Sequence, residues 1–321
     1  MYVLELAGED DEFAAAEAGN AARDVTVVSP GVVTAATIDE TALRHLAFTR
    51  RAASLLATTT ASIQAAQDAL RNASTDRSGT VAVRARDVRG TAGVDTQAAE
   101  AVLGSVLTEA GFSIDLEDPE NELVAIFSDD ICLLGWTVVE SIRDYGTRAP
   151  MDRPFFQPGS MGPLSARAVV NLAGVRSGDV VLDPMCGTGG LLIEAGLIGA
   201  RLLGFDAQRR MVRGTRHNLA EFVDTPFLLG VSDATALPVV LDGVDAVAFD
   251  TPYGRQSKIA THDLDVLVRG ALAETKRVAD RGVVVADREV TDVAESAGWS
   301  VRSVYERRVH RSLTRYVHVL R

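Results

Sequence analysis

The sequence predicts an α/β protein of two parts: a C-terminal doubly wound, mostly parallel sheet and an N-terminal α+β domain. Apolar strands alternate with amphipathic helices after residue 180, which is typical of a parallel sheet with helices on both faces. The length of 321 residues and the 47% hydrophobic composition suit two cores. Because Arg143–Gly162 is rich in Pro, Gly and Arg, we expect domains over residues 1–142 and 163–321 with a connector over 143–162.

The N-terminal domain is expected to mix strands and helices. In chain order, the expected elements are a first strand, an acidic helix, a strand at Asp24–Val28, a turn at Ser29–Gly31, a helix at Thr41–Ala57, a polar loop at Ser74–Gly79, a strand at Thr80–Arg86, a helix at Asp95–Glu109 and a strand ending near Ile126. By itself this pattern describes a small α/β module of no evident function.

The C-terminal domain is expected to alternate strand and helix throughout. Its expected strands are Val180–Leu182, Arg201–Asp206, Phe227–Gly230, Val244–Phe249, Gly282–Ala286, Val301–Tyr305 and Tyr316–Leu320. Its expected helices begin at Leu191 and span Arg209–Phe222, Leu264–Ala279 and Val290–Ala297. The last two strands, joined by a basic turn, predict an antiparallel hairpin at the edge of the sheet.

A glycine turn, Asp183–Gly190, joins the first strand of this domain to its first helix. Glycines let the backbone approach a ligand closely, and helix amides there suit a nucleotide or a carboxylate. The pattern is G-x-G-G after an acid, so a dinucleotide pyrophosphate fits it less well than the G-x-G-x-x-G pattern does. A tight turn without a ligand is the structural alternative.

Two further acids follow the next two strands. Asp206 ends a strand about twenty residues after the glycine turn, where such folds place the acid that accepts from ribose hydroxyls. Asp233 follows the third strand and is a candidate acceptor for an adenine amino group, although a solvated loop acid is nearly as plausible. The carboxyl ends of the strands meet at the edge where open α/β sheets bind ligands.

The fourth strand leads into Asp250-Thr251-Pro252-Tyr253. The amine on a nucleobase is a poor nucleophile because its lone pair is delocalised into the ring. Acceptance of its hydrogens by the Asp250 carboxylate and the Thr251 carbonyl would direct that lone pair at an electrophile. Pro252 favours an extended residue before it, and Tyr253 offers a stacking face. The structural alternative is an ordinary turn at the end of a strand.

These motifs resemble the class I methyltransferases with an Asp-Pro-Pro-Tyr-type signature, and more closely the archaeal tRNA guanine-10 N2-methyltransferase family. The resemblance rests on four segments: Arg153–Pro163, Asp183–Gly190, Leu192–Gly196 and Val309–Arg315. It implies S-adenosylmethionine as cofactor and one or two methyl groups placed on N2 of a tRNA guanosine. The cofactor-binding residues that it implies, together with the acids above, are Phe156, Pro158, Ser160, Met161, Asp183, Cys186, Gly187, Gly189, Asp206, Asp233 and Ala234.

Thr251 replaces the second residue of the family's usual Asp-Pro-Pro-Tyr. The contact ascribed to that residue comes from its carbonyl, which threonine also has, so activity is expected. The alternatives are a methyltransferase for another RNA guanosine or adenosine amino group, and a non-catalytic RNA-binding paralogue. The eukaryotic relatives use a small zinc-containing activator protein, which is a possible partner here.

The N-terminal part resembles a THUMP domain over Thr80–Arg86, Asp95–Glu109 and Phe112–Ile126. This resemblance implies binding of the 3′ acceptor end of tRNA. Arg84 and Arg86 are candidate phosphate contacts, with mere solvation as the alternative. Arg311 and Arg315 are further candidates because the last twenty residues hold six arginines and one acid. The alternative for these terminal arginines is pairing with acids on neighbouring strands.

A net charge of −12 argues against RNA binding. Lysine, however, occurs only at Lys258 and Lys276 among 32 basic residues, and we associate acidic, lysine-poor proteins with concentrated salt and hence with a halophilic archaeon. Near 1 M salt the Debye length is about 3 Å, so only charges in contact matter. Arginine's planar fork suits such contacts.

No apolar run approaches eighteen residues, and the acidic start lacks the basic region of a signal peptide. We therefore expect a cytoplasmic protein that does not bind a membrane.

Cys132 and Cys186 are too few for a disulfide framework or a zinc site, and both are expected to be buried. The five histidines show no metal-ligand spacing, so no metal site is expected.

Overall fold

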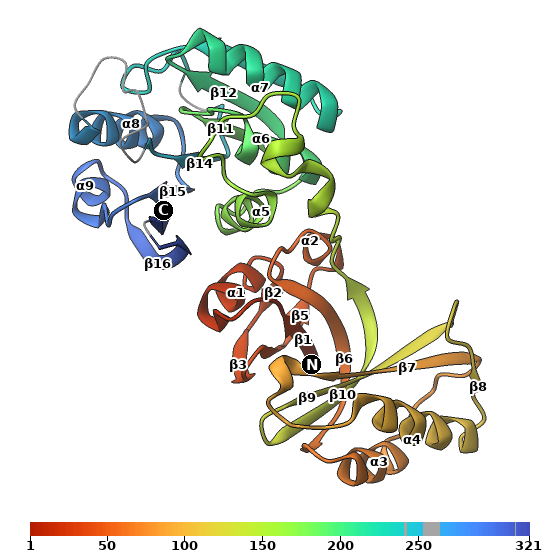
Figure 1. Ribbon diagram of the computed structural model, residues 1–321. Helices are drawn as coiled ribbons and strands as arrows, with labels where there is room; N and C mark the ends of the chain where they lie inside the picture. The colour runs from red at the N-terminus through yellow and green to blue at the C-terminus, as the bar shows by residue number, and fades with distance from the viewer. Residues whose placement is uncertain (241–242, 253–263, 312) are drawn as a thin grey trace. The chain divides into compact units, whose positions relative to one another are not determined.

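The computed structural model describes residues 1–240, 243–252, 264–311 and 313–321. It divides the chain into two compact units, Met1–Ile142 and Arg143–Arg321, each with its own sheet and buried core (Figure 1). Within the described ranges, no helix is both long enough and apolar enough to cross a membrane. Cys132 and Cys186 are both buried, as predicted.

The first unit is built on an eight-stranded sheet. In sheet order its strands are β3 (Thr26–Ser29), β4 (Val32–Ala35), β1 (Tyr2–Leu6), β6 (Thr49–Thr60), β10 (Ile131–Glu140), β9 (Asn121–Ser128), β7 (Thr80–Asp87) and β8 (Ser113–Ile114). Strand β7 runs parallel to β8 and β9, and the other pairs are antiparallel. A separate two-stranded ribbon joins β2 (Ala22–Arg23) to β5 (Thr37–Ile38).

Two helices, α3 (Ile63–Asn72) and α4 (Thr96–Glu109), pack on one face of this sheet. The Asp95 carboxylate accepts a hydrogen bond from the Ala98 amide at 3.1 Å, so Asp95 is the N-cap of α4, at the predicted start of this helix. The shorter helices of the unit are α1 (Asp11–Ala18), α2 (Glu40–Leu43) and the 3₁₀ turn η1 (Val88–Gly90). The predicted strand at Thr80–Arg86 is confirmed by β7.

The helix predicted over Thr41–Ala57 is wrong. Helix α2 ends at Leu43, and Thr49–Thr60 form β6, which pairs with β1 on one side and β10 on the other. Ladder hydrogen bonds from two neighbours outweigh the helical spacing of a few apolar residues. Register shifts against β10 accompany full burial of both Ala52 and Ala53, so the strand lacks the alternation that would identify it.

The second unit is the doubly wound sheet that the alternation predicted. In sheet order its strands are β13 (Phe227–Val231), β12 (Arg201–Asp206), β11 (Val180–Asp183), β14 (Ala246–Asp250), β15 (Gly282–Ala286), β17 (Leu313–Leu320) and β16 (Val301–His310). The first five strands are parallel, and β17 is antiparallel to both β15 and β16. The predicted terminal hairpin is confirmed, with strands longer than expected.

Helices lie on both faces of this sheet (Figure 1). In chain order they are η2 (Tyr145–Arg148), η3 (Pro150–Asp152), α5 (Pro163–Leu172), α6 (Gly190–Ile198), α7 (Arg209–Phe222), α8 (Leu264–Val278) and α9 (Thr291–Ser296). Helices α5, α6 and α7 contact β15, β11 and β12, whereas α8 and α9 share one apolar cluster with the sheet.

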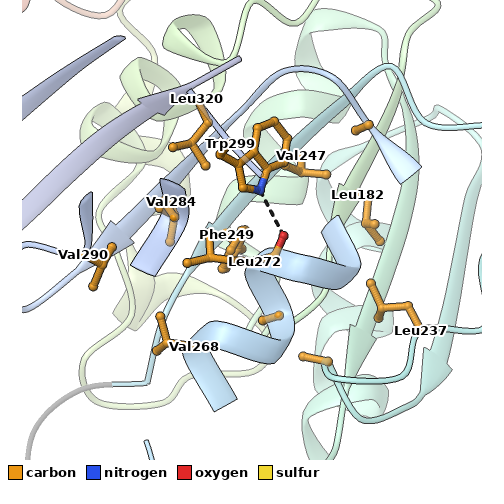
Figure 2. Packing of buried hydrophobic residues seen from close by; sticks show 14 of the residues in the cluster. Leu182, Leu237, Val247, Phe249, Val268, Leu272, Val284, Val290, Trp299 and Leu320 are labelled. Atoms are coloured by element: carbon orange, nitrogen blue, oxygen red, sulfur yellow. Dashed lines mark hydrogen bonds between the residues drawn. The ribbon is translucent and has the colours of Figure 1, made fainter. Parts of the chain in front are cut away.

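That cluster supports the strand that carries the predicted catalytic motif. Leu272 of α8 packs with Phe249 of β14 and Val284 of β15, all fully buried, and the Trp299 indole donates a hydrogen bond to the Leu272 carbonyl at 3.0 Å (Figure 2). Because Phe249 directly precedes Asp250, this packing sets the position of the end of β14.

Replacement of Leu272 by alanine should lower the free energy of unfolding of the second unit by about 2–5 kcal/mol, because a buried cavity replaces the side chain. We would follow urea unfolding by the fluorescence of Trp299 in a Trp136→Phe background. Val240→Ala is the matched control, because Val240 is 83% exposed. Equal effects of the two substitutions would contradict this account of the core.

Candidate active site

Three carboxylates end three adjacent parallel strands: Asp206 on β12, Asp183 on β11 and Asp250 on β14. Asp183, in the middle, is 2% exposed and accepts a hydrogen bond from the Met185 amide at 3.0 Å. Burial raises the pKa of Asp183 well above its usual value, the Met185 amide opposes this, and the charges of Asp250 and Asp206 raise it further. Three acidic groups therefore lie close together at the carboxyl edge of the sheet.

The glycine turn lies directly beside these acids. The Gly187 amide donates to Asp206 Oδ2 at 3.0 Å, and the Cys186 amide donates to the Phe205 carbonyl at 2.8 Å. Gly187 and Gly189 have φ angles of +53° and +80°, in the left-handed region that favours glycine. A Cβ on Gly189 would also lie 2.7 Å from Thr215 Cγ2, so the turn requires glycine there for space as well as for conformation.

Asp206 holds the turn through one oxygen and the start of α7 through the other. Its Oδ1 accepts from the Gln208 amide at 2.8 Å, and its Oδ2 from Gly187. Burial raises the pKa of Asp206, and the amides of Gln208 and Gly187 oppose the rise. Each carboxylate oxygen keeps acceptor capacity beyond one hydrogen bond, so the predicted ribose contact is chemically feasible.

Asp233 and Ala234 follow β13 at the same edge of the sheet. Asp233 Oδ1 accepts from the Thr235 amide at 2.9 Å and from the Thr235 hydroxyl at 2.8 Å, which forms a local turn. Ala234 is buried. The Ser232 amide donates to the Asp206 carbonyl at 3.2 Å and ties this turn to the end of β12.

Two polar residues of α7, Thr215 and Asn218, hold the glycine turn from behind, although neither was among the predicted site residues. The Thr215 hydroxyl donates to the Gly187 carbonyl at 2.7 Å, and the Asn218 amide group donates to the Thr188 carbonyl at 2.8 Å. Both side chains are fully buried. Their signal was available, because Thr215 and Asn218 lie three residues apart on the apolar face that also carries Leu219.

The segment 143–162 belongs to the second unit and packs against the same turn. The Ser160 and Thr188 hydroxyls lie 3.0 Å apart, and Asn218 also bonds the Phe155 backbone in both directions, at 2.8 and 2.9 Å. Of the predicted cofactor residues here, Met161 is 5% exposed, whereas Phe156 is 41% exposed and Pro158 is exposed.

A buried ionic cluster attaches this segment to α6. The Glu194 carboxylate, fully buried, accepts from Arg148 at 2.7 and 3.1 Å and pairs with Arg167 at 2.9 Å. Arg153, 4% exposed, donates to the carbonyls of Arg148 and Met161. Arg148 and Arg153, two of the arginines that suggested a connector in the sequence, are thus part of the packed interior of the second unit.

The catalytic motif begins at the end of β14. Asp250 pairs in register with Val285 of β15, and the Thr251 amide donates to the Val285 carbonyl at 2.8 Å. Thr251 is 3% exposed and Pro252 is partly exposed. Tyr253 lies outside the described residues. Asp250 Oδ2 lies 4.0 Å from Arg315 Nη2.

The four arginines predicted to bind RNA occupy different environments. Arg84 and Arg86 are partly exposed on β7 and pair with Glu122 at 3.5 Å and Glu5 at 3.4 Å. Arg311 is exposed in the turn after β16.

Arg315 requires a correction. It is 7% exposed and lies against Asp250, so it does not have the surface position that a phosphate contact needs. The acid that Arg315 approaches lies on β14, which β15 separates from β17 in the sheet.

Comparison with known proteins agrees with this architecture. Residues 150–317, just over half of the chain, match the family model described as an RMKL-like methyltransferase domain. A tRNA (guanine(10)-N2)-dimethyltransferase of Methanothermobacter thermautotrophicus is 39% identical over 245 residues, which cover 74% of this chain and 72% of the relative. The enzyme of the same name from Pyrococcus abyssi is 32% identical over 248 residues, covering 75% and 74%.

A solved structure, TrmN from Thermus thermophilus, has a TM-score of 0.51 and 20% identity, and the match covers 99% of this chain and 98% of that one. At this identity the likeness concerns the fold alone. The sequence relatives and the family model carry the assignment: this chain belongs to the family of the tRNA (guanine(10)-N2)-dimethyltransferases and contains an RMKL-like methyltransferase domain.

Proposed function

We propose that this protein is an S-adenosylmethionine-dependent methyltransferase that adds one or two methyl groups to the exocyclic N2 of a tRNA guanosine, at position 10. Membership of the family supports the reaction and the substrate class. The observation that carries the proposal is the place of Asp250-Thr251 at the end of β14, the strand paired directly with β11 and its glycine turn. An amine acceptor and a cofactor turn at adjacent strand ends are what methyl transfer to an amine requires.

The glycine turn and its neighbours fit S-adenosylmethionine. Gly187 and Gly189 leave the backbone bare in conformations that other residues rarely adopt, and Asp206 lies within hydrogen-bonding distance of that backbone. The proposed cofactor site comprises Asp206 for the ribose, Asp233 and Ala234 for the adenine, and, around the remainder, Phe156, Pro158, Ser160, Met161, Asp183, Cys186, Gly187 and Gly189. S-adenosylmethionine supplies a methyl group activated by a positively charged sulfur.

The charges at the carboxyl edge favour that cation. Asp183, Asp206 and Asp250 interact closely enough for the latter two to raise the pKa of Asp183. A bound cation beside the three would relieve this repulsion, and a neutral product would not. The acids therefore favour the charged cofactor over its demethylated form.

The catalytic motif prepares the guanosine amine. Asp250 accepts one N2 hydrogen and the Thr251 carbonyl accepts the other, which leaves the nitrogen lone pair directed at the methyl carbon. The proton that N2 loses is accepted by the Asp250 carboxylate. The hydrogen bond from the Thr251 amide to the Val285 carbonyl fixes the Asp250–Thr251 peptide, which precedes the peptide that carries the acceptor. Threonine retains the backbone carbonyl that proline would supply at this position.

The target base must leave its stack to reach these acceptors. Flipping a base out costs a few kcal/mol. Stacking on Tyr253 would offset about 1–3 kcal/mol of that cost, by analogy with other single-stranded sites. In this proposal Pro252 keeps the residue before it extended, and Tyr253 forms the flat wall of the base pocket.

We assign tRNA binding to a THUMP-containing domain over residues 1–142, with 143–162 as linker and cofactor-pocket segment and 163–321 as the methyltransferase domain. Arg84 and Arg86 alternate with Val83 and Ala85, which face the helices α3 and α4, so both arginines project from the opposite face of β7. Both remain partly exposed, at 35% and 47% of their side chains. Arg311 is a third candidate phosphate contact.

The proposal also includes a protein partner and a cytoplasm of high salt concentration. The outer strand β13 exposes Leu228 and Val231, at 57% and 50%, and this apolar edge suits the small zinc-containing activator protein. The protein acts in the cytoplasm of a halophilic archaeon, where screening by salt removes the long-range repulsion between its net charge of −12 and RNA.

The direct test is incubation with unmodified tRNA and methyl-labelled S-adenosylmethionine in high salt, followed by nucleoside mapping. We expect label in N2-methylguanosine or N2,N2-dimethylguanosine at position 10. Label in another guanosine or in adenosine would favour a different amino-group substrate. Absence of both label and cofactor binding would favour the non-catalytic RNA-binding protein that Thr251 suggests.

Asp250→Ala and Asp206→Ala should fail in different ways. Loss of an acceptor at the reacting amine should lower kcat by roughly 100-fold or more while cofactor affinity is retained. Loss of the ribose acceptor should instead raise the cofactor Kd by about 10- to 100-fold, the value of a hydrogen bond to a charged group. Calorimetric titration of cofactor and single-turnover transfer at saturating cofactor separate the two. Unchanged turnover in Asp250→Ala would remove Asp250 from the mechanism.

Arg84→Ala combined with Arg86→Ala should weaken tRNA binding without changing cofactor affinity, because both arginines belong to the first unit and the proposed cofactor site belongs to the second. The slope of log Kd against log salt concentration should become shallower by about 1 for each contact. Arg71→Ala is the matched control, since Arg71 is also a partly exposed, ion-paired arginine but lies on α3, on the other face of the sheet. Equal salt slopes for wild type and double variant would argue against this surface as the RNA site.

A further inference from the structure

Arg315 occupies an unusual position for a residue of a basic terminal segment. The register of the sheet pairs Tyr316 with Ala286, the last residue of β15. Because β17 runs antiparallel to β15, the beginning of β17 reaches the carboxyl edge where β14 ends. Arg315 is therefore carried to the active-site edge of the sheet, and only 8% of its side chain is exposed.

The Arg315 guanidinium contacts two segments that the proposed reaction uses. Its Nη2 lies 4.0 Å from Asp250 Oδ2 and donates to the Gly159 carbonyl at 3.3 Å. Gly159 precedes Ser160, whose hydroxyl lies 3.0 Å from that of Thr188 in the glycine turn. One side chain thus lies between the catalytic carboxylate and the segment that packs on the cofactor turn.

We propose that Arg315 is a positioning residue for methyl transfer, which holds the Asp250 carboxylate in place and ionised against the neighbouring acids. The inference rests on the proposed function, because it assigns Asp250 the role of amine acceptor. Arg315 acts through Asp250 and need not touch the guanosine or the cofactor.

A cation beside Asp250 is favourable because several acids lie together at the carboxyl edge of the sheet. Among the described residues, the charged neighbours of Asp250 include Asp183 of β11, whose pKa the Asp250 charge helps to raise, and Arg315 of β17, whose Nη2 lies 4.0 Å from Asp250 Oδ2. Because like charges repel, Asp183 and Asp250 disfavour each other's ionised forms, and a protonated Asp250 could not take up the proton that N2 loses. The nearly buried Arg315 acts in the opposite direction, and at this burial the interaction is weakly screened by salt.

The contact of Arg315 with the Gly159 carbonyl explains how Arg315 can fix the position of Asp250. A guanidinium is planar and presents several donors in fixed directions, so it can hold a carboxylate and a carbonyl at once. The Gly159 carbonyl anchors the guanidinium, and the anchored guanidinium limits where the Asp250 carboxylate can lie. Lysine would keep the charge at this site without the fixed geometry.

The test compares wild type with Arg315→Ala and Arg315→Lys, and uses Arg302→Ala as the control. Arg302 is an exposed arginine near the start of β16, beside Leu320 and hence at the opposite edge of the sheet. For each protein we would measure thermal unfolding, cofactor Kd, tRNA Kd, and the single-turnover rate of methyl transfer at saturating cofactor and tRNA across pH.

Arg315→Ala should lower the transfer rate by roughly 100-fold with cofactor and tRNA affinities near those of wild type, since the reacting carboxylate is misplaced. In the profile of transfer rate against pH, the loss of rate on the acidic side (the acid limb) should move to higher pH. Removal of a cation raises the pKa of a neighbouring carboxyl group. Arg315→Lys should recover the wild-type acid limb and only part of the rate. Arg302→Ala should match wild type.

An active wild-type protein with unchanged rate and acid limb in Arg315→Ala would overturn this inference alone. So would a loss confined to cofactor or tRNA affinity. A wild-type protein that transfers no methyl group to tRNA would overturn the proposed function and this inference with it. Where Arg315→Ala does not fold, Arg315→Lys decides, because a wild-type rate in that variant would contradict the geometric role.

Discussion

The parallel pairing of β11 with both β12 and β14 is the constraint on which the active site depends. Parallel neighbours end at the same edge, so the acids at positions 183, 206 and 250 are brought together although they are far apart in the chain. The arrangement is unfavourable for the ionised form of Asp183, whose pKa is raised first by burial and further by the charges of Asp250 and Asp206. Sites of function often retain such unfavourable interactions because the bound ligand relieves them.

The segment before α5 illustrates how buried polar groups hold a site together. Glu194 gathers Arg148 and Arg167, while Asn218 bonds both Phe155 and Thr188. Removal of one partner from a buried ion pair typically costs about 3–5 kcal/mol, since the other charge is left uncompensated. These contacts therefore favour one arrangement of residues 143–162 against the glycine turn, where a purely apolar contact would allow several.

Both units contain arginines that lie in contact with carboxylates. Arg51 lies within ion-pair distance of Glu5, Glu122 and Glu140 in the first unit, and Arg281 pairs with Asp179 in the second. Pairs at such distances persist where long-range fields are screened. The abundance of arginine over lysine suits them, because a planar fork can serve several carboxylates at once.

Local patterns were enough to predict the doubly wound sheet, its terminal hairpin and the order of the motifs along it. Strand β15 and helix α7 have the predicted bounds, because short apolar runs and helical periodicity are properties of neighbouring residues. Strand β6 was missed, since its conformation is set by β1 and β10, which lie elsewhere in the chain. The contact of Arg315 with Asp250 and the burial of Thr215 and Asn218 behind the glycine turn likewise arise from long-range packing. A pattern read along the chain records spacing, whereas these contacts depend on which strands and helices become neighbours in space.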